Sequence, residues 1–420
     1  MDGPVLLVEI QDSRISASEA ENHLKELKEL ARTLGWTDII EIVVRLREIS
    51  RGYLIGSGKV SEIQTLVNSE DIPTVVFDYD LTPLQQRNLE KIFETAVIDR
   101  QEIILEIFAE RARTREAVLQ VALARMRYSL PRLTRAWTHL SRQRGGVRGN
   151  RGKGETQLEY DRRKVLDKIT VLEKELEKIV RNRAVRRKKR SERPEATAAF
   201  MGYTNAGKSS LLNALTDAGI LEEDKLFATL DPTCRRYKLP GGKIILLTDT
   251  VGFIRKLPHS LIEAFKSTLE EAAGSDIIIH VLDASNPEWQ EHWKTTKGVL
   301  QELGADETPQ ITVFNKLDLV KEDRQTMDTL RILHPDAVFV SARTGEGLED
   351  FSSRITEALN KGRPAITLFI PYSRWDLAVY IRRNYANIEE IEKPDGIRIR
   401  VNLDDKDYRA LSDFISFSDD

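Results

Sequence analysis

A glycine-rich loop near the middle of the chain is the feature that most constrains the fold. Residues 202–209 read Gly-Tyr-Thr-Asn-Ala-Gly-Lys-Ser and fit the phosphate-binding pattern G-x-x-x-x-G-K-[ST]. In such loops backbone N–H groups surround phosphates, the lysine reaches the β and γ oxygens, and the serine hydroxyl binds Mg²⁺. A strand-like run precedes the loop and a helical pattern follows it, so the loop lies at a helix N-terminus, where anions are favoured. An ordinary tight turn is the alternative, but few chance matches would fall between a strand and a helix.

Composition limits the classes of protein that the chain can belong to. Its 420 residues suffice for roughly two to four domains. The formal net charge of −3 gives no overall attraction to nucleic acid, although it averages over local basic runs. No apolar stretch approaches the roughly 18–20 residues of a membrane span, and the first residues lack the basic start of a signal peptide. We therefore expect a cytosolic monomer, with partial membrane association left open.

The order of the expected elements divides the chain into four domains. Residues 1–100 alternate strands and helices, which predicts a small α/β domain, and residues 101–194 carry long helical patterns. Residues 195–362 alternate apolar strands with helices, as in a parallel sheet covered on both faces, and residues 363–420 predict a small α+β domain. Strands are expected at 5–10, 39–46, 74–78, 96–98, 197–201, 243–248, 277–282, 311–314, 338–340, 366–370, 388–392 and 397–402.

Two apolar stripes in residues 101–194 predict an antiparallel helical hairpin. They consist of Phe108, Ala112, Leu119, Ala122 and Met126 on one side, and of Val165, Ile169, Leu172, Leu176 and Ile179 on the other. Between them, residues 141–154 are rich in glycine and contain five cations and no acidic residue: Arg142, Arg144, Arg148, Arg151 and Lys153. This composition suits a phosphate-rich partner and favours RNA binding, whereas a solvated loop is the alternative.

Residues at the expected strand ends identify the nucleotide. Asp249 and Gly252 belong to an Asp-Thr-Val-Gly run, where the carboxylate can hold Mg²⁺ through water and the glycine N–H can reach a γ-phosphate. Asp318 follows another strand and can accept from the N1–H and N2 amine of guanine, a donor pair that adenine lacks. The Ala342 N–H could meet the guanine oxygen. These elements, in this order, predict a GTP-hydrolysing P-loop domain.

The fold class expected is therefore α/β. A P-loop GTPase domain with a parallel sheet is preceded by a small α/β domain and a long antiparallel helical hairpin, and is followed by a small α+β domain. We assign catalysis to Lys208 and Gly252. The other candidate nucleotide-binding residues from the motifs are Gly202, Tyr203, Thr204, Asn205, Ala206, Gly207, Ser209, Asp249, Thr250, Val251, Asn315, Lys316, Leu317, Asp318, Ser341, Ala342 and Arg343.

The strand-end motifs resemble those of translation-factor-related GTPases, and the wider chain resembles the HflX family of ribosome-associated GTPases. Motifs at 52–59, 84–89, 111–116, 154–159, 227–233 and 249–253 carry this second resemblance, which covers nearly the whole chain. It implies a GTPase that binds the large ribosomal subunit, with the basic segment 141–154 approaching the peptidyl-transferase region, and that separates stalled or idle ribosomes. Family members are also reported to use ATP through the N-terminal domain, but no motif in residues 1–100 leads to that by itself.

The resemblance adds five residues to the nucleotide site: Phe227, Ala228, Thr229, Leu230 and Asp231. It makes Thr229 the threonine that joins Ser209 on Mg²⁺, although the residues alone do not rank Thr229 above Thr233. Asn205 is similar to the asparagine of K⁺-stimulated GTPases, and support of the loop turn is the alternative role.

Phe253 follows the Asp-Thr-Val-Gly run, where many GTPases carry the glutamine that orients the attacking water. An apolar ring cannot do this, so we expect slow intrinsic hydrolysis and a partner that completes the site. The resemblance implies that the ribosome is this partner. Two alternatives stand: a regulatory GTPase that acts on a non-ribosomal protein, and an RNA-remodelling protein for which GTP is a structural ligand only.

Overall fold

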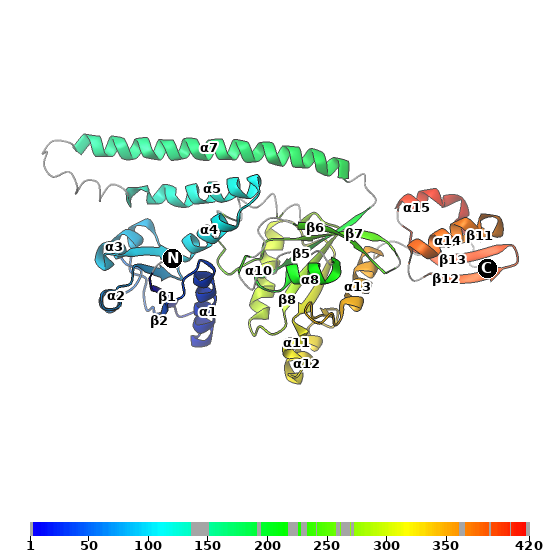
Figure 1. The fold of residues 1–420 in the computed structure, drawn as a ribbon, viewed down its shortest axis with the longest axis horizontal. Coiled ribbons are helices and arrows are strands. Elements are labelled where there is room, and N and C mark those ends of the chain that lie inside the picture. The colour runs from blue at the N-terminus through cyan, green and yellow to red at the C-terminus, as the bar shows by residue number, and fades with distance from the viewer. Residues whose placement is uncertain are drawn as a thin grey trace. The chain divides into compact units, whose positions relative to one another are not determined.

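The computed structural model describes residues 3–135, 151–190, 195–216, 226–227, 233–240, 242–257, 261, 269, 273–360, 366–385, 388–403 and 405–416. The chain is an α/β protein in which parallel strand pairs dominate the larger sheets (Figure 1). It forms two compact units. The first comprises Met1–Arg183, Glu223–Asp231 and Lys256–Lys266, and the second comprises Ala184–Glu222, Pro232–Arg255 and Ser267–Asp420. The four domain boundaries expected from the sequence stay predictions.

A four-stranded sheet organises the N-terminal part of the first unit. Its order is β2-β1-β3-β4 and each neighbouring pair is parallel. The strands are β1 (Val5–Gln11), β2 (Ile39–Arg45), β3 (Thr74–Phe77) and β4 (Ala96–Asp99). All four expected strands are confirmed here. Strand β1 illustrates why they were recognisable: its residues 5–10 are all buried, as expected for an apolar run in a parallel sheet that is covered on both faces.

Helices cover this sheet: α1 (Ala17–Thr33), α2 (Ser57–Ser69), α3 (Pro83–Phe93) and α4 (Arg100–Arg111). Helix α1 packs with α4, and α2 packs with α3. Capping boxes at Ser16 with Glu19 and at Thr82 with Gln85 begin α1 and α3, satisfying backbone N–H groups that would otherwise have no partner. These local signals determine where both helices begin.

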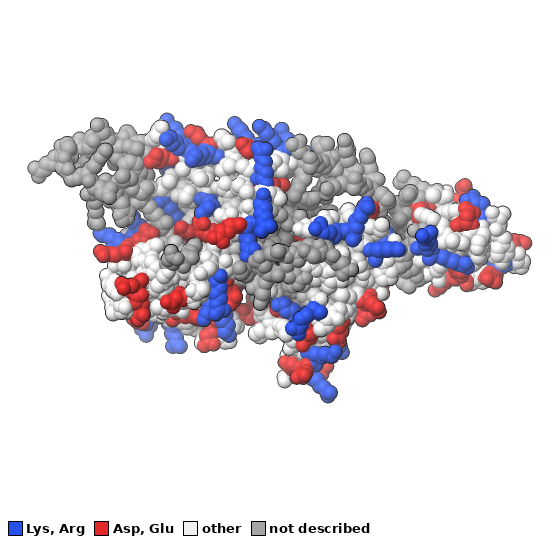
Figure 2. All heavy atoms as spheres, in the orientation of Figure 1, with Lys and Arg blue, Asp and Glu red and all other residues white. Residues whose placement is uncertain are grey.

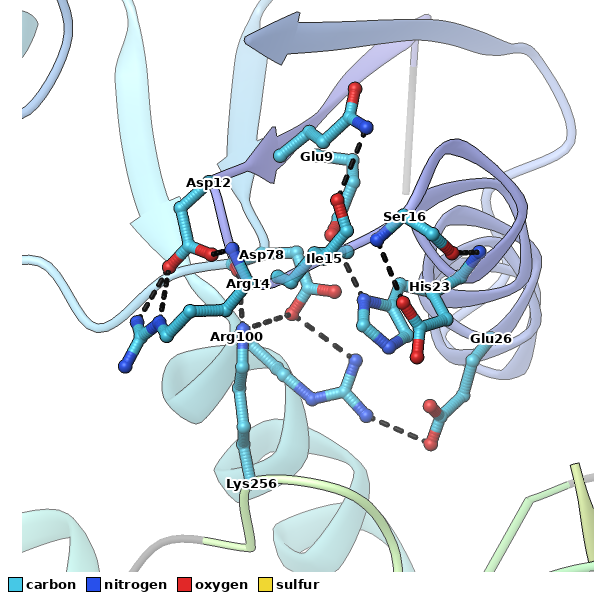
Figure 3. A network of polar contacts seen from close by, with 12 residues as sticks. Glu9, Asp12, Arg14, Ile15, Ser16, His23, Glu26, Asp78, Arg100 and Lys256 are labelled. Atoms are coloured by element: carbon cyan, nitrogen blue, oxygen red, sulfur yellow. Dashed lines mark hydrogen bonds and ion pairs between the residues drawn. The ribbon is translucent and has the colours of Figure 1, made fainter. Parts of the chain in front are cut away.

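Buried ion pairs lie at the carboxyl end of β3 (Figure 3). The guanidinium of Arg100 is fully buried and donates to Asp78 Oδ1 at 3.3 Å and to Glu26 Oε1 at 2.9 Å. Lys256, also in the first unit, donates to the Asp78 carbonyl oxygen at 3.1 Å. Asp78 is fully buried too, so its carboxylate depends on these cations to offset desolvation.

Two helices form the predicted hairpin: α5 (Arg115–Ser129), followed by the 3₁₀ turn η1 (Leu130–Arg135), and α7 (Arg151–Arg190). Leu123, Ile169 and Leu176 are buried between them. The predicted first stripe was partly wrong. Helix α4 ends at Arg111 and Thr114 caps α5, so Phe108 belongs to another helix, and Leu123 takes the place predicted for Ala122.

A six-stranded sheet forms the centre of the second unit, in the order β10-β9-β8-β5-β7-β6. The strands are β5 (Ala196–Gly202), β6 (Thr233–Lys238), β7 (Ile244–Asp249), β8 (Ile277–Asp283), β9 (Gln310–Asn315) and β10 (Val338–Phe339). All neighbouring pairs are parallel except β6 with β7. The sequence missed β6, because an exposed edge strand with Arg235 and Arg236 lacks an apolar run.

The helices of this part are α8 (Lys208–Thr216), α10 (Trp289–Glu302), α11 (Leu317–Val320), α12 (Arg324–Leu333) and α13 (Leu348–Asn360). The core contains fully buried side chains of β5, β8 and α13, among them Phe200, Ile279 and Phe351. Because the strands are parallel, the carboxyl ends of β5, β7, β8 and β9 meet at one edge, which is where such sheets bind ligands.

The C-terminal part forms an antiparallel sheet of three strands, in the order β11-β13-β12. Its elements are β11 (Ile366–Pro371), η2 (Tyr372–Arg374), α14 (Trp375–Asn384), β12 (Glu389–Lys393), β13 (Gly396–Val401), α15 (Asp405–Ala410) and η3 (Ser412–Phe414). The three strands expected here are confirmed. Across the described ranges, no helix combines the length and apolar character needed to cross a membrane.

Arg100→Met should destabilise the first unit by about 3–5 kcal/mol, because it leaves the buried Asp78 carboxylate without its guanidinium. Hydrogen exchange of the β3 amides should report the loss, since it follows opening of this part of the chain. Arg14→Met is the matched control: Arg14 pairs with Asp12 at the surface, where such a pair contributes only ~0–1 kcal/mol. Equal exchange rates in the two variants would contradict the prediction.

Candidate functional site

The glycine-rich loop connects the end of β5 to the start of α8. Gly202 has a φ of +154° and Gly207 a φ of +88°. A Cβ at these positions would collide with the carbonyl oxygen of Val281 and with the side-chain amide of Asn315, so only glycine fits. Asn205 is exposed and has a φ of +59°, a left-handed conformation that asparagine tolerates. Its backbone therefore suits the turn-supporting role, and its link to K⁺ stays a prediction.

Lys208 is the first residue of α8 and is buried behind the loop. Its Nζ donates to the carbonyl oxygens of Gly202 at 3.1 Å and Tyr203 at 2.7 Å. Burial lowers the pKa of Lys208 from 10.5 to about 8, and the nearby carboxylate of Asp249 acts in the opposite direction. An anion beside Nζ would stabilise the ammonium further, so the charge of this position favours phosphate.

Ser209 and Asp249 bring a hydroxyl and a carboxylate together next to the loop. Ser209 Oγ donates to Asp249 Oδ2 at 2.6 Å, and Asp249, the last residue of β7, is fully buried. Hydroxyl and carboxylate oxygens are ligands that Mg²⁺ prefers, so this pair fits that ion. Within the described residues, no group of three or more His, Cys, Asp or Glu side chains could hold a metal.

The segment after β7 packs directly on the loop. A Cβ on Gly252 would lie 2.8 Å from Thr204 Cα and 3.0 Å from Lys208 Nζ, so glycine permits this close approach. Thr204 Oγ1 is buried and, within the described part of the chain, has no hydrogen-bond partner. Such a group is costly unless a ligand satisfies it. Phe253 is only 1% exposed, so its ring belongs to the core.

Asn315 joins the loop to the other end of the site. Its Nδ2 donates to the Ala206 carbonyl oxygen at 3.0 Å, and its Oδ1 accepts from the Ala342 N–H at 3.0 Å. The Ala342 N–H, which the sequence analysis proposed as a donor to the guanine oxygen, thus already has a partner within the chain. Asn315 is 1% exposed, which makes both bonds costly to lose.

Asp318 lies beyond Asn315 with two partners of its own. Its Oδ1 accepts from Ser341 Oγ at 2.6 Å, and its Oδ2 pairs with Arg343 Nη2 at 2.5 Å. Lys316, with a φ of +64°, pairs with Asp283 at 2.8 Å. Asp283 was missed by the sequence, although its place at the end of β8 was a usable signal.

The structure brings together the candidate residues of the loop, of the segment 249–252 and of the loops after β9 and β10. The remaining candidate residues either lie elsewhere or fall outside the described residues. The ring of Phe227 packs against Phe108 of α4, with centroids 4.6 Å apart. Outside the described residues lie Ala228, Thr229, Leu230, Asp231, Arg142, Arg144 and Arg148. The backbone of Arg151 and Lys153 lies in the first turn of α7.

Family models match three consecutive parts of the chain. The GTP-binding GTPase N-terminal model matches residues 21–109, and the GTP-binding GTPase middle region matches residues 111–190. A 50S ribosome-binding GTPase model matches residues 197–316.

Relatives match over nearly the full length. GTPase HflX of Magnetococcus marinus is 43% identical over 389 residues, covering 92% of this chain and 90% of the relative. GTPase HflX of Akkermansia muciniphila is 44% identical over 423 residues, covering 98% and 96%. The crystal structure of an SsGBP and GDP complex shares 25% identity with a TM-score of 0.47, covering 86% of this chain and 99% of that one. The chain therefore belongs to the HflX family of GTPases and is a GTP-hydrolysing enzyme.

Proposed function

We propose that this GTPase binds the large ribosomal subunit and uses its nucleotide cycle to separate stalled or idle ribosomes. The match of residues 197–316 to a 50S ribosome-binding GTPase model carries the proposal. The basic segment 141–154 supports it, because five cations without an acidic residue suit rRNA phosphates. On the face drawn in Figure 2, described Lys and Arg side chains are interspersed with Asp and Glu.

In this proposal the loop 202–209 holds the phosphates of GTP. Its N–H groups and the Lys208 ammonium would contact the β- and γ-phosphates, and the Gly252 N–H would reach the γ-phosphate. The Thr204 hydroxyl, buried without a partner among the described residues, lies where a phosphate or its water could satisfy it.

Ser209 and Thr229 would hold Mg²⁺, with Asp249 acting through water. Bound there, the ion would neutralise charge on the phosphate oxygens. The Ser209–Asp249 hydrogen bond at 2.6 Å keeps the two candidate side chains in place. Asn205 remains the candidate residue for K⁺.

Asp318 would select guanine. Its carboxylate would accept from N1–H and the N2 amine, while Ser341 and Arg343 hold the carboxylate at 2.6 Å and 2.5 Å. Adenine offers no such donor pair and would leave the carboxylate without a base partner.

The burial of Phe253 supports slow intrinsic hydrolysis. A ring that is 1% exposed has no polar atom to orient water, and a glutamine in its place would supply one. A partner must then complete the site, and the large subunit is the partner that we propose.

GDP binding at pH 8 should take up about half a proton per site, because phosphate raises the lowered pKa of Lys208, which is about 8 in this structure. Titration calorimetry in two buffers of different ionisation enthalpy measures this uptake. Near pH 6.5 Lys208 is already protonated before GDP binds, so its contribution to proton uptake should vanish. The affinity for GDP should fall as the pH rises above 8. Proton release at pH 8 would contradict the prediction.

Asp318→Asn should weaken GDP binding by about 100-fold and create affinity for XDP. The amide can donate to the 2-oxo group of xanthine, where the carboxylate accepted from the N2 amine of guanine. Fluorescence titrations with both nucleotides test the change. Asp323→Asn is the control, since this exposed carboxylate caps α12 through the Thr326 N–H at 3.1 Å. It should keep the preference for GDP.

The ribosomal partner is tested by GTP turnover with and without 50S subunits and by cosedimentation in the GTP and GDP states. We expect stimulation by 50S subunits and GTP-dependent binding. Replacing Arg142, Arg144 and Arg148 with serine should reduce the stimulation by 50S subunits and the binding to them. It should also lower the number of counterions released on binding, measured from the salt dependence of the affinity, by roughly one per arginine. Serine at the exposed Arg87, Arg324 and Arg331 should change neither the stimulation nor the binding.

Equal turnover with and without 50S subunits would sink the proposal and favour a regulatory GTPase with another protein partner. Ribosome separation that survives Lys208→Ala would instead mean that GTP is only a structural ligand.

A further inference from the structure

We propose that Tyr203 is a positioning residue for GTP hydrolysis, which fixes the segment 252–255 against the phosphate-binding loop. The inference rests on the proposed assignment of the Gly252 N–H to the γ-phosphate. Tyr203 is the second residue of the loop, where the motif pattern accepts any side chain. The motif alone therefore does not explain why a tyrosine stands here.

Backbone hydrogen bonds connect the two segments on both sides of Tyr203. The Thr204 N–H donates to the Phe253 carbonyl oxygen at 2.7 Å, and the Phe253 N–H donates to the Gly202 carbonyl oxygen at 3.0 Å. Tyr203 and Phe253 thereby form a parallel bridge beyond the ends of β5 and β7. The register between loop and segment is set at this bridge.

The Tyr203 hydroxyl extends this connection. Its oxygen accepts from the Arg255 N–H at 2.6 Å, two residues beyond the bridge. The Tyr203 carbonyl oxygen accepts from Lys208 Nζ at 2.7 Å. One residue thus contacts both the lysine of the loop and the segment that carries Gly252.

Packing fixes the orientation of the Tyr203 ring. The ring is stacked on the imidazole of His292 in α10, with centroids 3.6 Å apart and planes 5° from parallel. Tyr203 is only 5% exposed. Helix α10 packs against β5 and β8, so a rigid element of the sheet supports the stack. The hydroxyl is consequently held at one place.

A fixed Tyr203 hydroxyl is important because the backbone at Gly252 packs closely against the loop. A Cβ there would lie 2.8 Å from Thr204 Cα, so a small shift of the segment would change the place of its N–H. Electrostatic stabilisation of a transition state depends on donors that are fixed before the reaction. The buried Phe253 ring cannot orient water, so fixed backbone donors are what this segment contributes.

Tyr203→Phe keeps the ring stack and removes one acceptor. We expect kcat for GTP in the presence of 50S subunits to fall about three- to tenfold, while KM and GDP affinity stay within about twofold of the unaltered protein. Tyr237→Phe is the matched control, because the Tyr237 hydroxyl makes a comparable bond to Ser352 Oγ at 2.7 Å away from the loop. It should leave kcat unchanged.

His292 supplies a second variant that keeps the hydroxyl. His292→Leu should lower kcat because the Tyr203 ring loses its stacking partner, and His292→Phe should restore it because the stack is kept. Hydrogen exchange of the Arg255 amide checks the contact without any chemistry: it should quicken in Tyr203→Phe and stay unchanged in Tyr237→Phe.

Faster exchange at Arg255 with unchanged kcat would overturn the inference, as would a fall in GDP affinity and thermal stability that accounts for all of the lost activity. Gly252→Ala separates this failure from that of the proposed site. If Gly252→Ala abolishes turnover and Tyr203→Phe does not alter it, only the role of Tyr203 is wrong. If Gly252→Ala also leaves turnover unchanged, the assignment of Gly252 is wrong.

Discussion

The side chain and backbone of Asn315 join three loops of the second unit, and the candidate site depends on this junction. The amide donates to Ala206 and accepts from Ala342, each at 3.0 Å, while the Asn315 carbonyl oxygen accepts from the Ala284 N–H at 2.9 Å. These partners follow β5, β10 and β8, whose carboxyl ends converge because the sheet is parallel. An unsatisfied buried group costs about 1–3 kcal/mol, so the loss of any of these bonds would be costly.

Charge in the site is arranged for a polyanion. The ammonium of Lys208 is buried against two carbonyl oxygens, which offset part of its desolvation, and burial still lowers its pKa to about 8. The carboxylate of Asp249, which accepts from Ser209 Oγ at 2.6 Å, acts on this pKa in the opposite direction. The cation is thus kept in place but incompletely compensated. In the function that we propose, phosphate would supply the missing charge.

Local signals made much of the fold predictable. Apolar runs located every strand of the N-terminal sheet, and the loop pattern located the turn between β5 and α8. Prediction from the sequence failed where tertiary contacts determine whether a strand forms or where a helix ends. Edge strand β6 carries the exposed Arg235 and Arg236 and lacks an apolar run. The break between α4 and α5 depends on a cap at Thr114 inside a continuous helical pattern. Motif spacing also singled out Asn315 and Asp318 as candidates, whereas the Tyr203–Arg255 contact joins residues with no shared pattern.

The side chain of Phe227, in the motif at 227–233, is positioned by packing against Phe108. The family resemblance places it with Thr229 at the nucleotide, which stays a prediction; its ring is 2% exposed and lies edge-on to Phe108, within the first unit. Its φ of +58° is a conformation that few non-glycine residues adopt, so packing of the ring must compensate for the backbone strain. Asn88 in the motif at 84–89 behaves alike, donating to the Gly52 carbonyl oxygen at 3.0 Å. In both motifs, therefore, contacts within the first unit determine where the side chain lies.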